Sequence, residues 1–173
     1  MSEDNFKASL KYVLEDEGGN DDDPADHGGR TSRGITQREY TAWLAEQGRP
    51  NVDVWHAPQV DIETIYHDEY WLPISTTLPK AIDYLYFDLC VNGGPGRAAI
   101  MLQRALGVAA DGRIGPLTRT AIAAADPRKL IIDFSEAKRQ WYISLHQQRF
   151  LRGWLNRTAN VQQRALAMLN GAT

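Results

Sequence analysis

Apolar residues recur at helical spacing in one segment after another, and most of these segments end at a glycine or a proline. In the first segment, Phe6, Leu10 and Val13 follow one another at intervals of four and three residues, which predicts a helix over residues 5–17. The glycine pair at positions 18–19 ends that helix. A chain with this pattern folds by packing helices together, and it has little sequence left for a sheet.

Further helices are predicted along the rest of the chain. Thr36 and Glu39 have the spacing of a capping box, which opens a second helix that ends near Gly48. Extended patterns are confined to residues 31–35 and the turn at 111–114, so we expect a mainly α fold with at most a small β-hairpin after the first helix. The remaining predicted helices cover residues 62–71, 79–92 and 97–106, a segment that starts at Pro116, a long segment from Pro127 toward Phe150, and a segment from Arg157-Thr158 to about residue 170.

Composition limits the classes of function. The 173 residues are 43% hydrophobic and 24% charged, which suits one globular body. The formal net charge of −3 argues against non-specific nucleic-acid binding. No apolar run approaches the roughly 20 residues that cross a bilayer. The N-terminus begins with acidic residues, so we expect no cleavable secretion signal.

Cysteine and histidine are too few and too scattered to predict a metal centre. Cys90 is the single cysteine, which excludes an intramolecular disulfide and a cysteine-rich metal site. The four histidines have no metal-binding spacing such as HExxH. We therefore expect no metal and no cofactor, and we expect Cys90 to be a small buried residue.

Three acidic residues end the first predicted helix, and only one of them lies in its apolar stripe. Glu17 follows Phe6 by three helical turns, whereas Glu15 and Asp16 point away from that stripe. Burial and the negative end of the helix dipole both disfavour an ionised carboxylate there, and general acid catalysis needs a carboxyl that keeps its proton. The alternative, that Glu17 only ends the helix and reaches water, fits the periodicity equally well.

The segment from residue 20 to residue 34 is rich in Asp, Gly and Pro and predicts a long loop. Its acids and hydroxyls, Asp26 and Thr31 among them, offer a second catalytic group, because a carboxylate beside a hydroxyl can hold and deprotonate water. The simpler interpretation of the three aspartates at 21–23 is a solvated acidic turn. The loop also lacks the pattern of a calcium-binding EF-hand.

Two series of residues carry a resemblance to a known family. The first series is Glu17-Gly18-Gly19, Asp23-Pro24-Ala25-Asp26, Gly28-Gly29 with Thr31, and Gly34-Ile35-Thr36. The second series includes Leu102-Gln103, Asp111-Gly112, Gly115-Pro116 with Thr118, and Gly153-Trp154-Leu155-Asn156-Arg157. The first resembles the opening signature of glycoside hydrolase family 108, a group of lysozyme-like N-acetylmuramidases. The second is similar to the peptidoglycan-binding segment fused to these hydrolases.

This resemblance implies a lysozyme-like helical fold, with residues 1–80 as the catalytic part and residues 81–173 as a C-terminal helical part in the same body. It implies hydrolysis of the β-1,4 bond between N-acetylmuramic acid and N-acetylglucosamine in bacterial peptidoglycan. Glu17 is then the general acid, while Asp26 and Thr31 orient the attacking water. The resemblance continues through Tyr70-Trp71 and through Asn92 with Gly94. Together with Gln103, these positions give the substrate-binding candidates, which are Tyr70, Trp71, Asn92 and Gln103.

Alternatives stay open for some of these residues and for the enzyme class. Trp71 lies on a helical stripe, so it also suits a position in the core. A transglycosylase, which forms an anhydro sugar without water, is the competing enzyme. A wall amidase or peptidase would need a zinc site, for which the sequence offers no ligand pattern.

The resemblance leaves the biological setting open. A small wall hydrolase without a secretion signal resembles a phage endolysin, which is made in the host cytoplasm and acts in the periplasm or cell wall after release through holin pores. The alternatives are a bacterial muramidase that assists protein secretion and a non-catalytic peptidoglycan-binding protein. We expect peptidoglycan as the partner, no nucleic acid, no membrane span, and a monomer.

Overall fold

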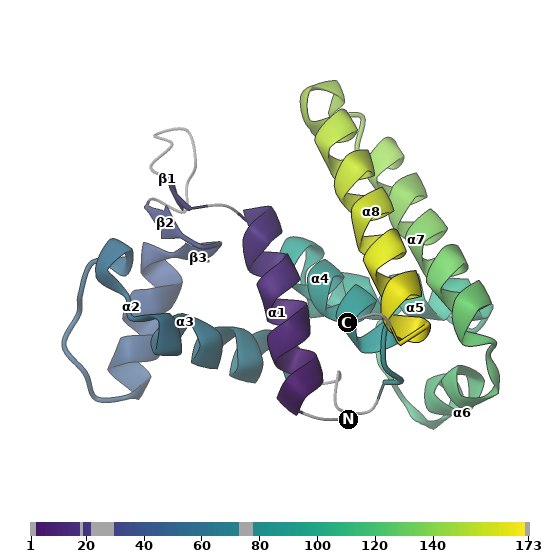
Figure 1. Ribbon diagram of the computed structural model, residues 1–173, viewed down its shortest axis with the longest axis horizontal. Coiled ribbons are helices and arrows are strands. Elements are labelled where there is room, and N and C mark those ends of the chain that lie inside the picture. The colour runs from purple at the N-terminus through teal and green to yellow at the C-terminus, as the bar shows by residue number, and fades with distance from the viewer. Residues whose placement is uncertain (1–2, 18, 22–29, 73–77, 172–173) are drawn as a thin grey trace. The chain divides into compact units, whose positions relative to one another are not determined.

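The computed structural model describes residues 3–17, 19–21, 30–72 and 78–171, which form two compact units (Figure 1). The small unit is Lys7–Glu69, and the large unit is Met1–Phe6 together with Tyr70–Thr173. Helices dominate both units, so the predicted mainly α class is confirmed. The division that the sequence predicts after residue 80 stays a prediction.

The small unit combines most of the first helix with a minimal sheet and short helical segments. The predicted small β-structure after the first helix is confirmed, because the sheet consists of two-residue antiparallel strands in the order β1-β2-β3. The elements are α1 (Glu3–Glu17), β1 (Asn20–Asp21), β2 (Thr31–Ser32), β3 (Ile35–Thr36), α2 (Gln37–Glu46), η1 (Val54–His56), α3 (Gln59–Ile65) and the π-helix η2 (Tyr66–Trp71).

The predicted capping box at the start of α2 is confirmed. The Thr36 hydroxyl accepts a hydrogen bond from the Glu39 backbone N–H at 3.2 Å, and Glu39 Oε2 accepts one from the Thr36 backbone N–H at 2.9 Å. Both bonds satisfy backbone donors that a helix N-terminus otherwise leaves open. Since Thr36 is also the last residue of β3, the box fixes the angle at which the sheet leads into α2.

The large unit is a group of helices packed around α4. Every side chain from Ile82 to Cys90 is buried. Burial raises the pKa of the Cys90 thiol to about 12, and the expectation of a small buried residue at this position is confirmed. The longest helices, α7 and α8, lie side by side (Figure 1). The elements are α4 (Ile82–Gly93), α5 (Pro95–Leu106), α6 (Pro116–Ala124), α7 (Pro127–Ser144) and α8 (Gln148–Leu169).

The predicted boundary between the last two helices is wrong. The helix that begins at Pro127 ends at Ser144, and α8 begins at Gln148, so Phe150 lies on α8. His146 adopts a φ of 54° between them, which ends the helix although no glycine or proline marks the place. Thr158 starts no helix, because it lies inside α8, where its hydroxyl donates to the Trp154 carbonyl one turn earlier at 2.8 Å.

A buried ionic cluster joins three helices of the large unit. Asp88 on α4 has no exposed surface and pairs with Lys138 on α7 and Arg157 on α8. Burial alone would raise the pKa of Asp88, but the two cationic partners outweigh it and hold the pKa below its usual value. The carboxylate therefore stays ionised and ties α4 to the α7–α8 pair.

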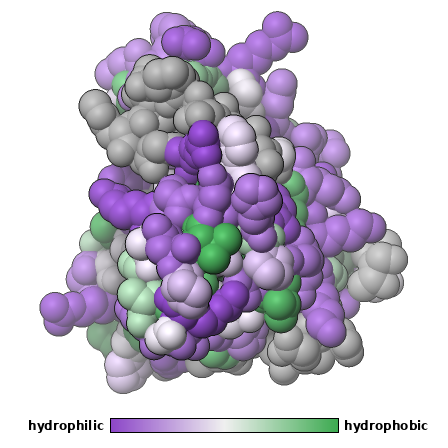
Figure 2. Space-filling model, turned by 90° about the vertical axis from the view of Figure 1, so that its left-hand side faces the viewer, coloured by the Kyte–Doolittle hydropathy of each residue, from purple (hydrophilic) through white to green (hydrophobic). Residues whose placement is uncertain are grey.

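The surface gives two further observations. The face in Figure 2 is mostly hydrophilic and shows only small, separated apolar areas among the coloured atoms. In the part of the chain that the structure describes, no helix combines the length and the apolar character that a transmembrane segment requires.

Candidate active site

Glu17 is the last residue of α1 and packs against the turn between β2 and β3. Its side chain is half-buried. A carbon added at Gly34 would lie 3.1 Å from Glu17 Oε2 and 2.5 Å from the Tyr66 hydroxyl oxygen. The missing side chain at Gly34 therefore provides the space in which the carboxyl and the phenol lie.

The turn that carries Gly34 has an unusual backbone. Arg33 has a φ of 51° and Gly34 a φ of 82°, and Ser32 pairs directly with Ile35 on either side of them. Two central residues with positive φ are typical of a two-residue type I′ hairpin. The second position favours glycine, and at this position glycine is also required by the contact with Glu17.

Several hydrogen bonds hold this turn in place. The Arg33 backbone N–H donates to the Gly19 carbonyl at 3.2 Å, just after the end of α1. The Arg33 guanidinium donates to Gln59 Oε1 and to the Ala57 carbonyl, both at 2.7 Å. The chain before α3 and the chain after α1 are therefore both tied to the turn beside Glu17.

Tyr66 contacts the turn at Arg33 and Gly34. Its hydroxyl donates to the Arg33 carbonyl at 2.8 Å, and the residue has no exposed surface. Tyr66 begins the π-helix η2, where the sequence predicts an ordinary α-helix. Short π segments inside helices are frequent at functional sites. Here the π-helix begins at the residue whose phenol lies next to Gly34.

Thr31, the predicted hydroxyl partner, lies on the central strand β2. Its backbone pairs with Asp21 of β1 and Thr36 of β3. Its half-buried side chain belongs to the same small sheet that carries the turn at Gly34. Asp26, the predicted carboxylate partner, lies outside the described residues, so its role stays a prediction.

An exposed tryptophan beside Thr31 was not anticipated from the sequence. Trp55 on η1 donates its ring N–H to the Thr31 carbonyl at 3.0 Å, while 36% of the residue stays exposed. The Arg30 guanidinium lies 4.6 Å from the centre of its ring. The Trp55 backbone N–H and Arg30 also lower the pKa of Asp53, which caps η1. An aromatic ring held in this way can stack on a sugar face.

A groove of about 680 Å³ runs beside α1 in the small unit. It is built from α1, α3 and Arg33, the same segments that position Glu17 and Gly34. Its walls carry both signs of charge beside the side chains of Leu10 and Leu14, so it offers both polar and apolar contacts to a ligand. The charged residues that line it are Lys7, Lys11, Glu15, Arg33 and Glu63.

The structure places the predicted substrate-binding residues in the large unit, in different surroundings. Trp71 is 3% exposed, and its ring lies 5.5 Å from that of Phe6 and 5.3 Å from that of Phe87. This is the core position that the sequence left open as its alternative. Tyr70 is half-buried. Asn92 is exposed and donates to the Asp88 carbonyl at 2.6 Å.

Gln103 organises the loop that precedes α6. Its amide nitrogen donates to Asp111 Oδ1 at 2.7 Å and to the Arg113 carbonyl at 2.9 Å. Its amide oxygen accepts from the Gly112 backbone N–H at 2.9 Å. Gln103 is 1% exposed, and these hydrogen bonds satisfy its buried amide group. Its side chain therefore supports the loop structurally.

A metal site would need several His, Cys, Asp or Glu side chains close together among the described residues. Within them, no three His, Cys, Asp or Glu side chains gather closely enough to hold a metal ion. The expectation that the protein needs no metal or cofactor stays a prediction, because the acidic loop at 22–29 lies outside these residues.

Comparisons with known proteins cover nearly the whole chain. The family model for glycosyl hydrolase 108 matches residues 10–94. A solved structure, SagA of Brucella abortus, is 33% identical in sequence, and the match covers 96% of each chain with a TM-score of 0.81. The chain belongs to glycosyl hydrolase family 108. The resemblance seen in the sequence is therefore confirmed.

The second half of this family 108 chain has a separate match. The model described as a predicted peptidoglycan domain covers residues 97–159, which include Gln103 and the loop that it holds. Glu17, Thr31, Gly34 and Tyr66 all fall within the hydrolase match. The comparison with curated proteins yields no match.

Proposed function

We propose that the protein is a muramidase that hydrolyses the β-1,4 bond between N-acetylmuramic acid and N-acetylglucosamine in bacterial peptidoglycan. The observation that carries the proposal is the carboxyl of Glu17, held at the end of α1 against Gly34 inside a family 108 domain. The accompanying peptidoglycan domain supports the choice of substrate.

Glu17 acts in this proposal as the general acid. It donates its proton to the bridging oxygen as the bond from that oxygen to the sugar C1 breaks. A water molecule held by Asp26 and Thr31 adds to C1 and passes a proton to Asp26. Thr31 is suited to this task because it lies on the strand that leads into the turn beside Glu17.

Trp55, rather than Trp71, stacks on a sugar ring in this proposal. Trp55 offers an exposed ring beside Thr31, whereas Trp71 is enclosed by the aromatic rings of the core. The mixed charges of the groove beside α1 suit the acetamide, hydroxyl and carboxylate groups of a muramic acid chain. We therefore assign the first sugar contacts to the small unit.

Digestion of purified peptidoglycan followed by mass spectrometry tests the proposal. The expected fragments end in a reducing N-acetylmuramic acid and carry one added water per cleaved bond. Fragments that end in anhydromuramic acid would instead identify a transglycosylase. Fragments that have lost only peptide, with the glycan intact, would contradict both glycosidic assignments.

The setting in which the enzyme acts is a separate proposal. The sequence favours a phage endolysin, made in a host cytoplasm and released through holin pores, whereas the solved relative comes from a bacterium. Expression in a bacterial host with and without a co-expressed holin tests the endolysin role. Lysis that depends on the holin and on Glu17 supports it, and growth that continues in both cultures contradicts it.

A further inference from the structure

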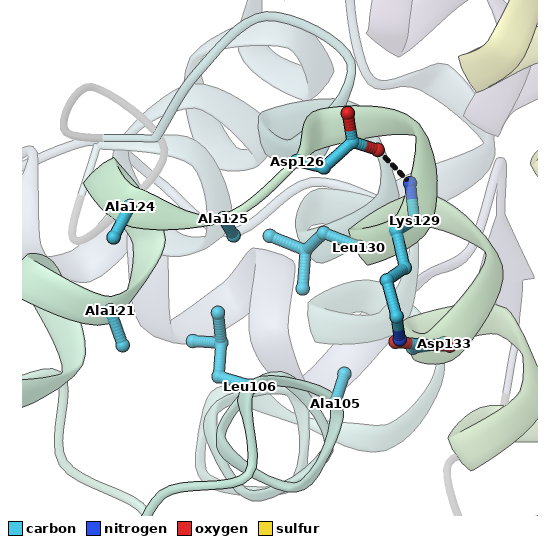
Figure 3. A pocket seen from close by; sticks show the side chains of 9 residues that line it. All are labelled: Ala105, Leu106, Ala121, Ala124, Ala125, Asp126, Lys129, Leu130 and Asp133. Atoms are coloured by element: carbon cyan, nitrogen blue, oxygen red, sulfur yellow. Dashed lines mark hydrogen bonds and ion pairs between the residues drawn. The ribbon is translucent and has the colours of Figure 1, made fainter.

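A cavity of about 360 Å³ in the large unit plays no part in the proposed hydrolysis (Figure 3). It lies where the end of α5, the helix α6 and the first turns of α7 meet. All of its lining residues fall within the match to the peptidoglycan domain. Its volume is within the range of small-ligand sites, roughly 300–1,000 Å³.

Methyl groups form the inner wall of this cavity. Leu130 is 3% exposed, and Ala121 and Ala125 are half-buried. In Figure 3 the side chains of Leu106 and Leu130 point toward the centre, and the alanines of α6 lie to one side of them. This wall suits a small apolar group, such as the methyl of an alanine residue.

Charged side chains form the opposite rim. Asp126, Lys129 and Asp133 are spaced by three and four residues, so they lie on one face of the first two turns of α7 (Figure 3). The Lys129 ammonium pairs with Asp133 Oδ2, and the Lys129 backbone N–H donates to Asp126 Oδ1 at 2.7 Å. The rim therefore carries two carboxylates and one ammonium.

This ion pair can exchange its partners at little cost. The Lys129 side chain is 73% exposed and that of Asp133 is 33% exposed. Exposed pairs of this kind contribute little to stability because water and salt screen them. A ligand with its own ammonium and carboxylate can therefore replace both halves of the pair at the same time.

We propose that this cavity binds the peptide stem of peptidoglycan. An alanine methyl packs on Ala121 and Leu130, the ammonium of a neighbouring diamino acid lies between the two aspartates, and a free carboxylate binds Lys129. Stem peptides combine these groups within adjacent residues, whereas the glycan chain has no ammonium. The inference rests on the proposed function in that peptidoglycan is the substrate.

The test measures binding of the free tetrapeptide alanyl-glutamyl-diaminopimelyl-alanine to the full chain by titration calorimetry. Ala124→Trp places a ring over the cavity, and Ala123→Trp places the same ring on a neighbouring exposed residue of α6 that does not line it. We expect Ala124→Trp to weaken binding by about tenfold or more and Ala123→Trp to leave it unchanged. Circular dichroism verifies that both variants fold.

A second variant tests the charged rim. Lys129→Gln removes the ammonium that faces the ligand carboxylate, and its exposure means that the fold tolerates the change. We expect weaker binding of the free tetrapeptide by this variant and little difference for a tetrapeptide whose carboxylates are amidated. Equal losses for both peptides would contradict the assignment of Lys129.

The outcomes separate this inference from the proposed function. Absence of tetrapeptide binding, or equal binding by Ala123→Trp and Ala124→Trp, overturns the stem site even if the protein cleaves peptidoglycan. Tetrapeptide binding by a chain that releases no muramic acid ends supports the stem site and contradicts the muramidase.

Discussion

Glu17 Oε2 lies 3.1 Å from the position that a side-chain carbon would take at Gly34. Gly34 lies in a turn whose backbone is held from several sides, and Glu17 packs against it from the end of α1, so the carboxyl is placed by contacts that form only in the folded chain. Adding a single carbon atom at Gly34 is therefore expected to displace the Glu17 carboxyl.

Replacing Gly34 by alanine is expected to reduce both stability and activity. The added carbon would meet the Tyr66 hydroxyl at 2.5 Å, and a φ of 82° disfavours any residue with a side chain. We expect the free energy of unfolding to fall by at least about 1 kcal/mol. We expect activity to fall by roughly 10- to 100-fold, because displacement of a catalytic group by about 1 Å is costly. Urea unfolding and release of reducing ends measure the two effects.

Gly153→Ala is the matched control for that change. Gly153 lies within α8, has nothing within 4 Å of an added carbon, and has no positive φ. Alanine should therefore stabilise the helix by up to about 1 kcal/mol. Adding Tyr66→Phe to Gly34→Ala removes the nearest clashing atom and should recover part of the lost stability. No recovery would contradict the direct contact.

Asp83 gives a prediction about pH. It has no exposed surface, accepts hydrogen bonds from the Asn5 side chain and the Tyr84 backbone N–H, and burial raises its pKa to about 6. A carboxyl whose pKa is higher in the folded state favours folding while it is protonated, and this contribution is lost as pH rises from about 4 to about 6.

Asp83→Asn should remove this dependence. Above pH 6 we expect the variant to be more stable than the wild type by about 2–3 kcal/mol, and below pH 4 we expect the two proteins to be alike. Thermal unfolding across pH 4–8 measures the difference. A constant difference at every pH would mean that packing, and not titration of Asp83, causes it.

Gln103 gives a prediction about the loop before α6. Gln103→Leu would keep the volume of the side chain but remove its bonds to Asp111, Gly112 and Arg113. Asp111 keeps its bond from the Arg113 backbone N–H, but the Gly112 N–H and the Arg113 carbonyl lose their bonds to Gln103, which should cost about 1–3 kcal/mol. The backbone N–H of Gly112 should exchange with deuterium much faster than in the wild type. Unchanged exchange would contradict the structural role of Gln103.

The sequence predicts features that depend on near neighbours. The capping box at Thr36 and Glu39 was predictable because both of its bonds lie within one helical turn. The start of α7 at Pro127 follows from a rule of the same kind. In the same way, the position of Glu17 at the end of α1 follows from helical spacing and the glycine pair after it.

Features that depend on distant contacts could not be predicted. Arg33 takes a positive φ that arginine rarely adopts, and the bonds that hold it there are made to Gly19, Ala57 and Gln59, which are distant in the sequence. The role of Tyr66 depends on a turn more than 30 residues earlier in the chain. The break after Ser144 has no glycine or proline to mark it.

The most direct test of the account compares Glu17→Gln with Glu46→Gln. Each glutamate is the last residue of its helix, but Glu46 is exposed at the end of α2 and Glu17 packs against Gly34. The measurement is the rate at which each variant releases reducing muramic acid ends from purified peptidoglycan, with circular dichroism as the check of folding. We predict a rate at least about 100-fold below wild type for Glu17→Gln and a wild-type rate for Glu46→Gln. A Glu17→Gln variant that cleaves peptidoglycan at the wild-type rate would contradict the account.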